Sequence, residues 1–443
     1  RLLSRGLGDV YKRQALLSQR YQQELAEITT NNWFYKIQWK LQEDNRKSQN
    51  CQRGNWLIFA DSTGVGESIA AQLQQEGNEC ILVYRGETYQ NNQAGIYQVN
   101  PSNIQDFEQL YQTITSNHQL SLQKVIHLWS LDATSPKKLT TASLAEAQLL
   151  GCGSVVHLLQ SLVTNAESTL PNLWLITRGT QAVLSEAENL TVAASPLWGL
   201  GRTIAFEHPQ FWGGLIDLDP HSSKDEVEIL LQQITNSHIE DHLAIREGKT
   251  YVPRLVKHFP QGAQPLSLSA DATYIITGGL GALGLQTAEW MAAKGAKHLA
   301  LIGRRQPSEQ AQQTIQCLEG LGVDVTVLSA DISIEADVFN ILEKVQTPPL
   351  RGIIHAAGVL DDGILQQMSW ERFSKVMAPK VMGAWNLHNL TQNLSLDFFV
   401  CFSSMSSLLG SPGQGNYAAA NAFMDTLASV SYTHLTLPTK VTV

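Results

Sequence analysis

The 443-residue sequence has little cysteine, no long hydrophobic run and no excess of basic residues. Its five cysteines are scattered, with no CxxC pair and no Cys/His set, which argues against a disulfide framework and against a zinc site. No apolar run approaches the roughly 20 residues that span a bilayer and no secretory pattern is visible, so we expect a protein of the reducing cytoplasm without a membrane partner. The net charge of −9 argues against a nucleic-acid partner.

What the sequence does contain is a globular composition and a regular alternation of strands and helices. Hydrophobic residues make up 43%, and the length predicts two or three domains. Short buried strands alternate with helices from Trp56 to Thr177 and again from Thr273 to His355, a pattern typical of parallel sheets covered by helices. A hairpin is expected at residues 243–255. We therefore predict an α/β chain with two tandem Rossmann-like, doubly wound parallel sheets and a weak internal duplication.

Composition also predicts the boundaries of these parts. We expect a non-native start and linker at residues 1–30, a structural subdomain at 31–257, a linker at 258–270, a catalytic subdomain at 271–430 and a non-native tail at 431–443. The first βα turn, at residues 61–66, contains two glycines but no full GxGxxG pattern. The first subdomain is therefore expected to keep a nucleotide-binding fold without binding a nucleotide.

The second subdomain starts with a glycine-rich turn between a strand and a helix. Gly279-x-Gly281-x-x-Gly284 lets the backbone approach a pyrophosphate at a helix N-terminus, which predicts dinucleotide binding. An acidic residue for the ribose 2′-hydroxyl is absent, and Arg304 and Arg305 end the next strand, which favours NADP(H) over NAD(H). A flavodoxin-like turn and a solvated basic loop are the alternatives.

Further cofactor contacts are expected after the next two strands. Asp331 could accept a hydrogen bond from an adenine amino group, or cap the following turn. The small residues after His355 leave room for a cofactor, although a tight turn would need them too. The predicted cofactor-binding residues are Thr277, Gly278, Gly279, Leu280, Gly281, Leu283, Gly284, Arg304, Arg305, Asp331, Ile332, Ala356, Ala357 and Gly358. No metal site is expected.

A strand that ends in serines is followed by a tyrosine at the start of an Ala-rich helix. Thirteen positions separate Ser404 from Tyr417, and Tyr417 shares a helix face with Asn421. Close helix packing would explain the alanines but not the serines or the tyrosine, so we interpret this stretch as a catalytic edge. Lys380 lies among apolar residues at helical spacing and could point inward, although spacing alone favours a surface lysine.

Together, residues 277–284, 355–358, Lys380 and 404–421 resemble the ketoreductase domain of modular polyketide synthases and related fatty acid synthases, which are short-chain dehydrogenase/reductase relatives. The resemblance covers roughly residues 30–430, because the stretch from Trp198 to Leu218 looks like the inactive structural subdomain of these enzymes. Tyr-x-x-x-Asn with an upstream lysine distinguishes this group from free-standing reductases that carry Tyr-x-x-x-Lys.

The resemblance implies a role for each candidate catalytic residue. Tyr417 would protonate the substrate carbonyl oxygen, and Ser404 would hold that oxygen. Lys380 would stabilise the phenolate, and Asn421 would position Lys380 or a relaying water. The implied reaction is NADPH-dependent reduction of a β-ketoacyl thioester on an acyl carrier protein to a β-hydroxyacyl thioester. Other domains of the same synthase would be further partners.

Two other features follow from the resemblance. Leu360-Asp361-Asp362 matches the motif of B-type members, and Leu409 replaces the tryptophan of A-type members, so a D-configured hydroxyl is implied; helix capping by the aspartates is the alternative. Family members continue beyond the tyrosine helix with two more strands and a lid, so we expect a C-terminally truncated chain. A free-standing reductase of a small ketone and a non-catalytic cofactor-binding or scaffolding fragment remain open.

Overall fold

The computed structural model describes most of the chain. The described residues are 33–42, 54–93, 95–118, 122–165, 170–184, 190–235, 240–258 and 267–434. The expected start at 1–30, most of the expected linker and the end of the expected tail lie outside these ranges, as does Cys51. Of the described cysteines, Cys80, Cys152, Cys317 and Cys401 are free thiols.

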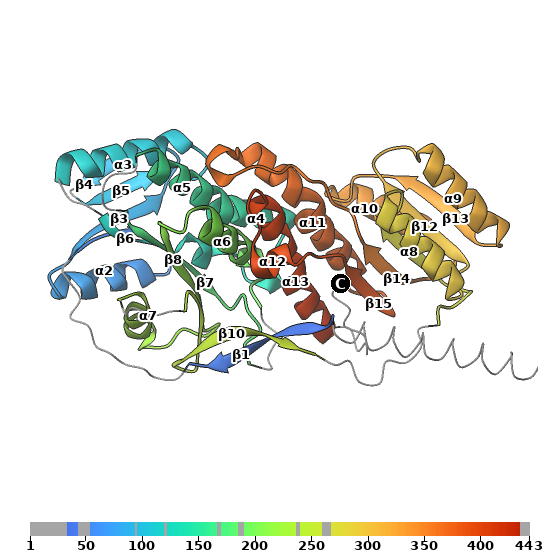
Figure 1. The fold of residues 1–443 in the computed structure, drawn as a ribbon, viewed down its shortest axis with the longest axis horizontal. Helices are drawn as coiled ribbons and strands as arrows, with labels where there is room; N and C mark the ends of the chain where they lie inside the picture. Colours follow the sequence, from blue (N-terminus) through green and yellow to red (C-terminus); the bar gives the residue numbers. More distant parts are fainter. Residues whose placement is uncertain are drawn as a thin grey trace, which may run out of the picture.

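Residues 33–258, called the first half below, form a ten-stranded sheet (Figure 1). The order is β1-β10-β9-β8-β7-β6-β2-β3-β5-β4. Pairing is parallel from β9 to β5, as predicted, and antiparallel at both edges. The predicted hairpin is β9–β10, whose two-residue turn only an antiparallel pair can use. The strands are β1 (Tyr35–Leu41), β2 (Asn55–Phe59), β3 (Glu79–Arg85), β4 (Gln90–Gln93), β5 (Ile96–Val99), β6 (Leu122–His127), β7 (Asn172–Arg178), β8 (Trp212–Leu218), β9 (His242–Arg246) and β10 (Lys249–Lys257).

Helices cover both faces of this sheet. Among the described residues, Thr141–Thr164 form one helical stretch long and apolar enough to cross a bilayer, which the search for apolar runs did not anticipate. Because 67% of its apolar window is buried within the protein, it is best interpreted as a core helix. The helices are α2 (Val65–Gln75), α3 (Ile104–His118), α4 (Thr141–Gln148), α5 (Ser154–Thr164), α6 (Pro196–Glu207) and α7 (Glu226–Thr235), with a π-helical turn η3 (Leu149–Gly153) joining α4 to α5.

Residues 267–434, the second half, form a five-stranded sheet in the order β13-β12-β11-β14-β15, and every pair is parallel. This order places the switch point of a doubly wound sheet between β11 and β14. The last helix runs to His434, beyond the break expected at Ser431. The elements are β11 (Thr273–Thr277), α8 (Ala282–Ala293), β12 (His298–Gly303), α9 (Glu309–Gly320), β13 (Asp324–Ser329), α10 (Glu335–Lys344), β14 (Leu350–His355), η5 (Leu365–Gln367), α11 (Trp370–Thr391), β15 (Phe398–Cys401), α12 (Ser406–Leu409) and α13 (Gly415–His434).

The two sheets repeat one another at their centres. The run β3-β2-β6-β7 in the first half matches the run β12-β11-β14-β15 in the second. In the register, Phe59 pairs with His127, and Thr277 pairs with His355 at the equivalent place. The matching order confirms the predicted duplication at the level of the fold.

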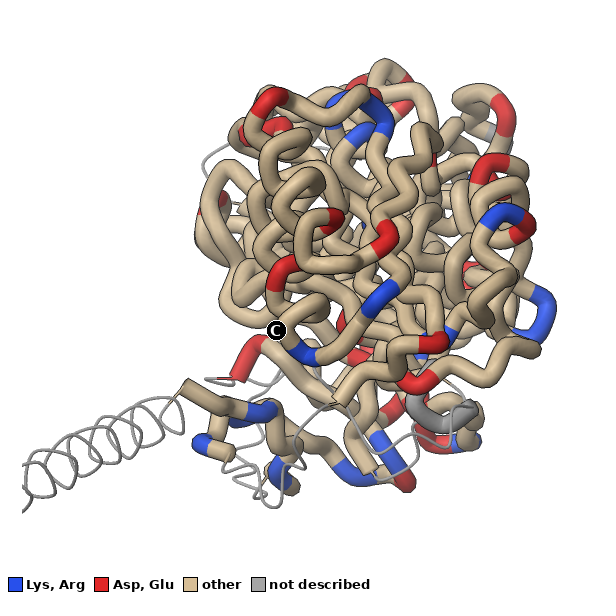
Figure 2. The backbone as a smooth tube through the Cα atoms, turned by 90° about the vertical axis from the view of Figure 1, so that its right-hand side faces the viewer, with Lys and Arg blue, Asp and Glu red and all other residues tan. Residues whose placement is uncertain are grey.

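The two halves share one hydrophobic core, which includes Trp198 and Leu200 of α6 together with Ala419 and Phe423 of α13. Figure 1 shows α6, α11 and α13 between the two sheets. The helices approach closely because a Cβ at Gly199 would lie only 2.1 Å from the carbonyl oxygen of Ala418. Viewed from the end formed by the second half, basic and acidic residues are mixed rather than separated by sign (Figure 2).

Candidate active site

The loop after β11 is built from glycines that the surrounding backbone requires. Gly278 has a φ of +67°, and a Cβ on Gly284 would lie 2.3 Å from the carbonyl oxygen of Gly278. Gly281 differs, because a Cβ there would meet only one atom, at 3.3 Å. It is also the N-cap of α8 and has no capping side chain. A helix start with unpaired N–H groups and no side chain at its N-cap fits the pyrophosphate of a dinucleotide.

In the first half, a carboxylate of the chain itself fills the equivalent position. Asp61 is fully buried and accepts hydrogen bonds from the backbone N–H groups of Thr63, Val65 and Gly66 at 3.0, 3.3 and 2.8 Å. These groups lie at the start of α2, so an incoming phosphate would meet a negative charge at the donors it needs. This arrangement gives a physical reason why the first half can keep the fold without binding a nucleotide.

The predicted cofactor residues after β12 and β13 lie next to one another. Arg304 Nη1 is 3.7 Å from Asp331 Oδ2, and the Arg304 side chain is half exposed. Arg305 is also exposed. Asp331 Oδ1 accepts hydrogen bonds from the backbone N–H and the hydroxyl of Ser333. Burial alone would raise the pKa of Asp331, but the hydrogen bonds from Ser333 and the Arg304 charge outweigh it and lower this pKa. Asp331 therefore has the turn-capping contacts of the alternative interpretation and also faces Arg304.

Some of the other predicted cofactor residues are exposed around the loop after β11, and others are buried. Thr277 is fully buried, with its hydroxyl 2.7 Å from His355 Nδ1, so it supports the loop from below. Ile332 is buried against Gly383, whereas the Leu283 side chain is exposed. The residues Leu280, Gly278, Ala356, Ala357 and Gly358 are at least partly exposed around the loop.

Lys380, Tyr417 and Asn421 come together from α11 and α13, and Ser404 lies in the loop after β15. Lys380 is 4% exposed, and its Nζ donates hydrogen bonds to Asn421 Oδ1 at 3.0 Å and to the carbonyl oxygen of Phe402 at 2.9 Å. The same Nζ lies 5.1 Å from the centroid of the Tyr417 ring. Asn421 Nδ2 donates to the carbonyl oxygen of Tyr417 at 2.8 Å, which fixes the orientation of its amide. Lys380 thus points inward, as its helical spacing allowed.

The ammonium group of Lys380 is held in a poorly solvated environment. Burial lowers the pKa of Lys380 to about 8, although nearby Cys401 and Asp425 raise it. Burial, together with the charge of Lys380, lowers the pKa of His355 to about 3, so this histidine is neutral. Lys380 is therefore the cation placed to stabilise a phenolate at Tyr417.

Both candidate hydroxyl groups have a proton to donate. The Ser404 oxygen accepts hydrogen bonds from the backbone N–H of Ser406 at 3.2 Å and from the Ser406 hydroxyl at 3.1 Å, which leaves its own proton free. Tyr417 is partly exposed, and its hydroxyl has no hydrogen-bond partner among the residues that the structure describes. Each of the two hydroxyl groups could therefore donate a hydrogen bond to an incoming carbonyl oxygen.

The residues predicted for stereocontrol border the same region. Asp361 Oδ1 accepts hydrogen bonds from Arg372 Nε at 2.8 Å and Nη2 at 2.6 Å, and Arg372, followed by Lys375, lowers the pKa of Asp361. Ser369 caps α11, so the interpretation of the aspartates as helix caps is wrong for this helix. Leu360 and Leu409 are both exposed, and Asp362 accepts a hydrogen bond from Gln414.

The structure adds two charged residues that the sequence reasoning missed. Asp425 accepts a hydrogen bond from the Ser407 hydroxyl at 2.5 Å, and burial raises its pKa despite that bond. Arg202 of α6 donates to the carbonyl oxygen of Ser407. The spacing of Tyr417, Asn421 and Asp425 could have identified the aspartate, since all three share a helix face. No local signal marks Arg202, because its hydrogen bond joins the first half to the second half.

Comparison with known proteins identifies this arrangement. The family model "KR domain" matches residues 272–437, and the model "Beta-ketoacyl synthase-like, N-terminal" matches residues 54–237. A solved structure of A-type ketoreductases from a modular polyketide synthase is 27% identical with a TM-score of 0.76, and the match covers 92% of this chain and 82% of that one. The chain belongs to the ketoreductase domains of polyketide synthases. The first ketoreductase of the tylosin synthase is similar at 28% identity and a TM-score of 0.74, with 92% and 81% coverage.

The ketoreductase also has curated relatives that are much longer than itself. It is 39% identical over 297 residues to a 6-methylsalicylic acid synthase of Arthrobotrys oligospora and 32% identical over 418 residues to the polyketide synthase GfsA of Streptomyces halstedii. These matches cover 62% and 91% of this chain but 16% and 5% of the relatives. Ketoreductases of this family are nicotinamide-dependent oxidoreductases, and every predicted site residue lies inside the matched KR region.

Proposed function

We propose that the chain catalyses the NADPH-dependent reduction of a β-ketoacyl thioester, carried by an acyl carrier protein, to a β-hydroxyacyl thioester. The observation that carries this proposal is the buried contact of Lys380 with Asn421 and with the ring of Tyr417, beside a glycine loop that is open at Gly281. We further propose that it works beside other domains of one synthase in the cytoplasm, where its free thiols would stay reduced.

The bound NADPH supplies the hydride. Ser404 donates a hydrogen bond to the substrate carbonyl oxygen and orients it. Tyr417 donates its proton to the same oxygen, and the phenolate that remains is stabilised by the Lys380 ammonium group. This help matters because a phenol with an ordinary pKa near 10 is a slow proton donor at neutral pH. Asn421 holds Lys380 in place through its side-chain oxygen.

Two finer parts of the proposal concern the cofactor and the product. Arg304 and Arg305 supply guanidinium groups after β12, which supports NADPH over NADH because a 2′-phosphate would be neutralised there. The motif at Leu360, Asp361 and Asp362 and the absence of tryptophan at Leu409 support a B-type, D-configured hydroxyl. Chiral analysis of the product tests this assignment, and an L-configured hydroxyl would contradict it.

NADPH oxidation with a β-ketoacyl thioester tests the reaction. Tyr417→Phe removes the proton donor, so kcat should fall by about 10²–10⁴-fold while NADPH still binds. Tyr84→Phe is the matched control, because Tyr84 bonds to Glu67 in the first half and should leave kcat unchanged. Wild-type kcat in Tyr417→Phe would disprove the catalytic assignment. Equal turnover of small free ketones would favour a free-standing reductase, and NADPH binding without turnover would favour a scaffolding role.

A further inference from the structure

A glutamate at the end of α6, in the first half, holds two separate loops of the second half. Glu207 Oε2 accepts a hydrogen bond from the backbone N–H of Leu365 at 2.6 Å, and Oε1 accepts one from the backbone N–H of Gly413 at 2.7 Å. Leu365 begins the turn η5 after the Asp361–Asp362 segment, and Gly413 lies two residues before α13. One carboxylate therefore bridges the loop that follows Asp362 and the loop that precedes α13.

The same two loops are joined to each other and to the tyrosine helix. The N–H of Gly363 donates to the carbonyl oxygen of Gly413 at 2.8 Å. Asn416 Nδ2 donates to the carbonyl oxygen of Asp361 at 2.9 Å, and Asn416 Oδ1 accepts from the N–H of Tyr417 at 2.7 Å. The position of the first turn of α13 thus depends on where these loops lie.

A second residue of the first half holds the turn η5 from its other side. Gln160 of α5 is buried, and its Nε2 donates to the carbonyl oxygens of Leu365 and Met368 at 2.7 and 2.9 Å. Both backbone groups of Leu365 are therefore bound by the first half. The Gln160 contact does not extend to Gly413, so Glu207 differs from it in bridging both loops.

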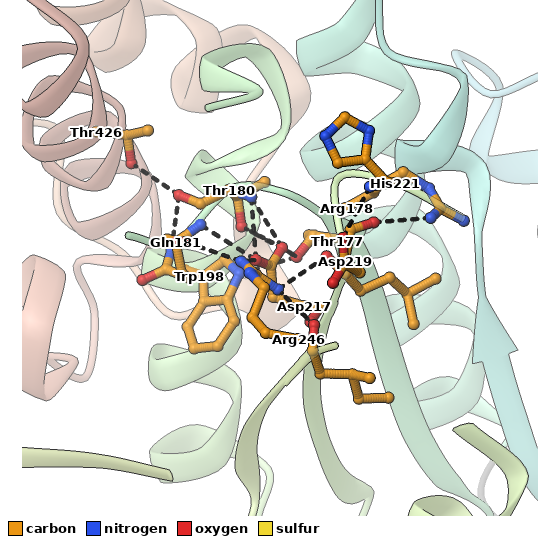
Figure 3. A network of polar contacts seen from close by, with 12 residues as sticks. Thr177, Arg178, Thr180, Gln181, Trp198, Asp217, Asp219, His221, Arg246 and Thr426 are labelled. Atoms are coloured by element: carbon orange, nitrogen blue, oxygen red, sulfur yellow. Dashed lines mark hydrogen bonds and ion pairs between the residues drawn. The ribbon is translucent and has the colours of Figure 1, made fainter. Parts of the chain in front are cut away.

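Further along α13, the first half makes a weaker contact. Thr426 donates to the carbonyl oxygen of Thr180 at 3.5 Å, in a loop whose N–H groups are held by the buried carboxylate of Asp217 (Figure 3). Arg246 pairs with that carboxylate at 2.5 Å. This network fixes the loop within the first half, whereas Glu207 acts on the loops that precede Tyr417.

We infer that Glu207 is a positioning residue for reduction, which sets the place of Tyr417 by bridging the loops at Leu365 and Gly413; the inference rests on the proposed function. A carboxylate suits this role because it has two acceptor oxygens and no proton to donate at neutral pH. Charged acceptors also make stronger hydrogen bonds to N–H groups than neutral ones. Since catalysis depends steeply on the distance between donor and carbonyl, small loop shifts would lower turnover without affecting the glycine loop.

The test compares Glu207→Gln and Glu207→Asp in the full chain. The glutamine keeps one acceptor but places an amide N–H₂ against the other backbone donor, and the aspartate is one methylene too short to reach both. Hydrogen exchange of the peptides covering residues 359–368 and 410–416 reports directly on the two bridged N–H groups. We expect Glu207→Gln to exchange at least about 10-fold faster in both peptides, with kcat about 10-fold lower, KM and the NADPH Kd within about twofold, and Glu207→Asp intermediate.

Two control variants separate positioning from general loss of stability. Glu240→Gln removes a first-half carboxylate that binds Arg254 away from these loops, so exchange and kcat should match wild type. Gln160→Leu should speed exchange in peptide 359–368 but leave peptide 410–416 as in wild type.

Each outcome decides between the possibilities. Unchanged exchange in both peptides of Glu207→Gln, or faster exchange with an unchanged kcat, overturns the inference. Equal effects in Glu240→Gln would show general destabilisation and would also overturn it. If wild type binds NADPH but reduces no thioester, the proposed function fails, while exchange in the two peptides still decides whether Glu207 bridges the loops.

Discussion

Raising the pH from 7 to 10 should stabilise the folded protein through the loss of one proton from Lys380. Burial lowers the pKa of Lys380 from 10.5 to about 8. Below pH 8, Lys380 is protonated in both the folded and the unfolded protein, and only in the folded protein is its charge buried at a cost in free energy. Between pH 8 and 10.5 the folded protein releases this proton while the unfolded chain retains it, so the contribution of Lys380 to stability rises with pH.

The size of the effect follows from the two pKa values. Their difference of about 2.5 corresponds to about 3 kcal/mol, or about 1.4 kcal/mol for each pH unit in this range. Burial also raises the pKa of Cys401 to about 12, and this thiol acts in the opposite direction, since an unfolded cysteine loses its proton first. A comparison with Lys380→Met removes this contribution, because both proteins contain Cys401.

Urea unfolding of wild type and Lys380→Met, followed by tryptophan fluorescence between pH 7 and 10, measures the difference. The free energy of unfolding of wild type minus that of the variant should rise by about 2–3 kcal/mol across this range. Lys344→Met is the control, because Lys344 is exposed at the end of α10 and should follow the wild-type curve. A difference that stays constant within about 0.5 kcal/mol would refute the reasoning and would mean that the Lys380 charge is solvated.

The remaining predictions concern the two βα loops. Gly281→Ala should weaken NADPH binding and leave thermal stability near wild type, because its Cβ would meet a single atom, the carbonyl oxygen of Gly278 at 3.3 Å. Gly284→Ala should lower the free energy of unfolding by about 1–3 kcal/mol, since its Cβ would lie 2.3 Å from the same oxygen. Cofactor titration and thermal melts distinguish the two, and the same loss in both variants would contradict the assignment. Asp61→Ala should lower the free energy of unfolding by about 1–3 kcal/mol by leaving three N–H groups unpaired, with the NADPH Kd unchanged; tighter or looser NADPH binding would be evidence against a purely structural role.

The parts of the site that the sequence predicted are those with local signals. Strand alternation predicted both sheets, and the glycine spacing at 279–284 predicted the tight turn between β11 and α8, because φ and close approach are properties of single residues. Helical spacing placed Tyr417 and Asn421 on one face. The antiparallel hairpin β9–β10 was predicted from its local pattern. The antiparallel pairs β1–β10 and β4–β5 were not, because pairing direction depends on which strands meet.

Lys380 shows the limit of such signals. Its helix and its apolar surroundings were visible in the sequence, but a lysine among apolar residues also suits a surface. Its partner Asn421 is 41 positions away, and only the packing of α11 against α13 brings the two together. The resemblance to a family supplied this contact; the residues alone left both interpretations open.

The sequence alone therefore determined which groups are available: the glycine loop, the arginines after β12, the two hydroxyl groups, the lysine and the amide. Tertiary structure decided which of them lie together. It placed Lys380 against Asn421, 41 positions away, and it set Glu207 against an N–H group 206 positions away. The physical reason is the separation along the chain over which each interaction acts. Backbone conformation and helix faces depend on near neighbours, whereas burial and hydrogen bonds between loops depend on how the two halves pack.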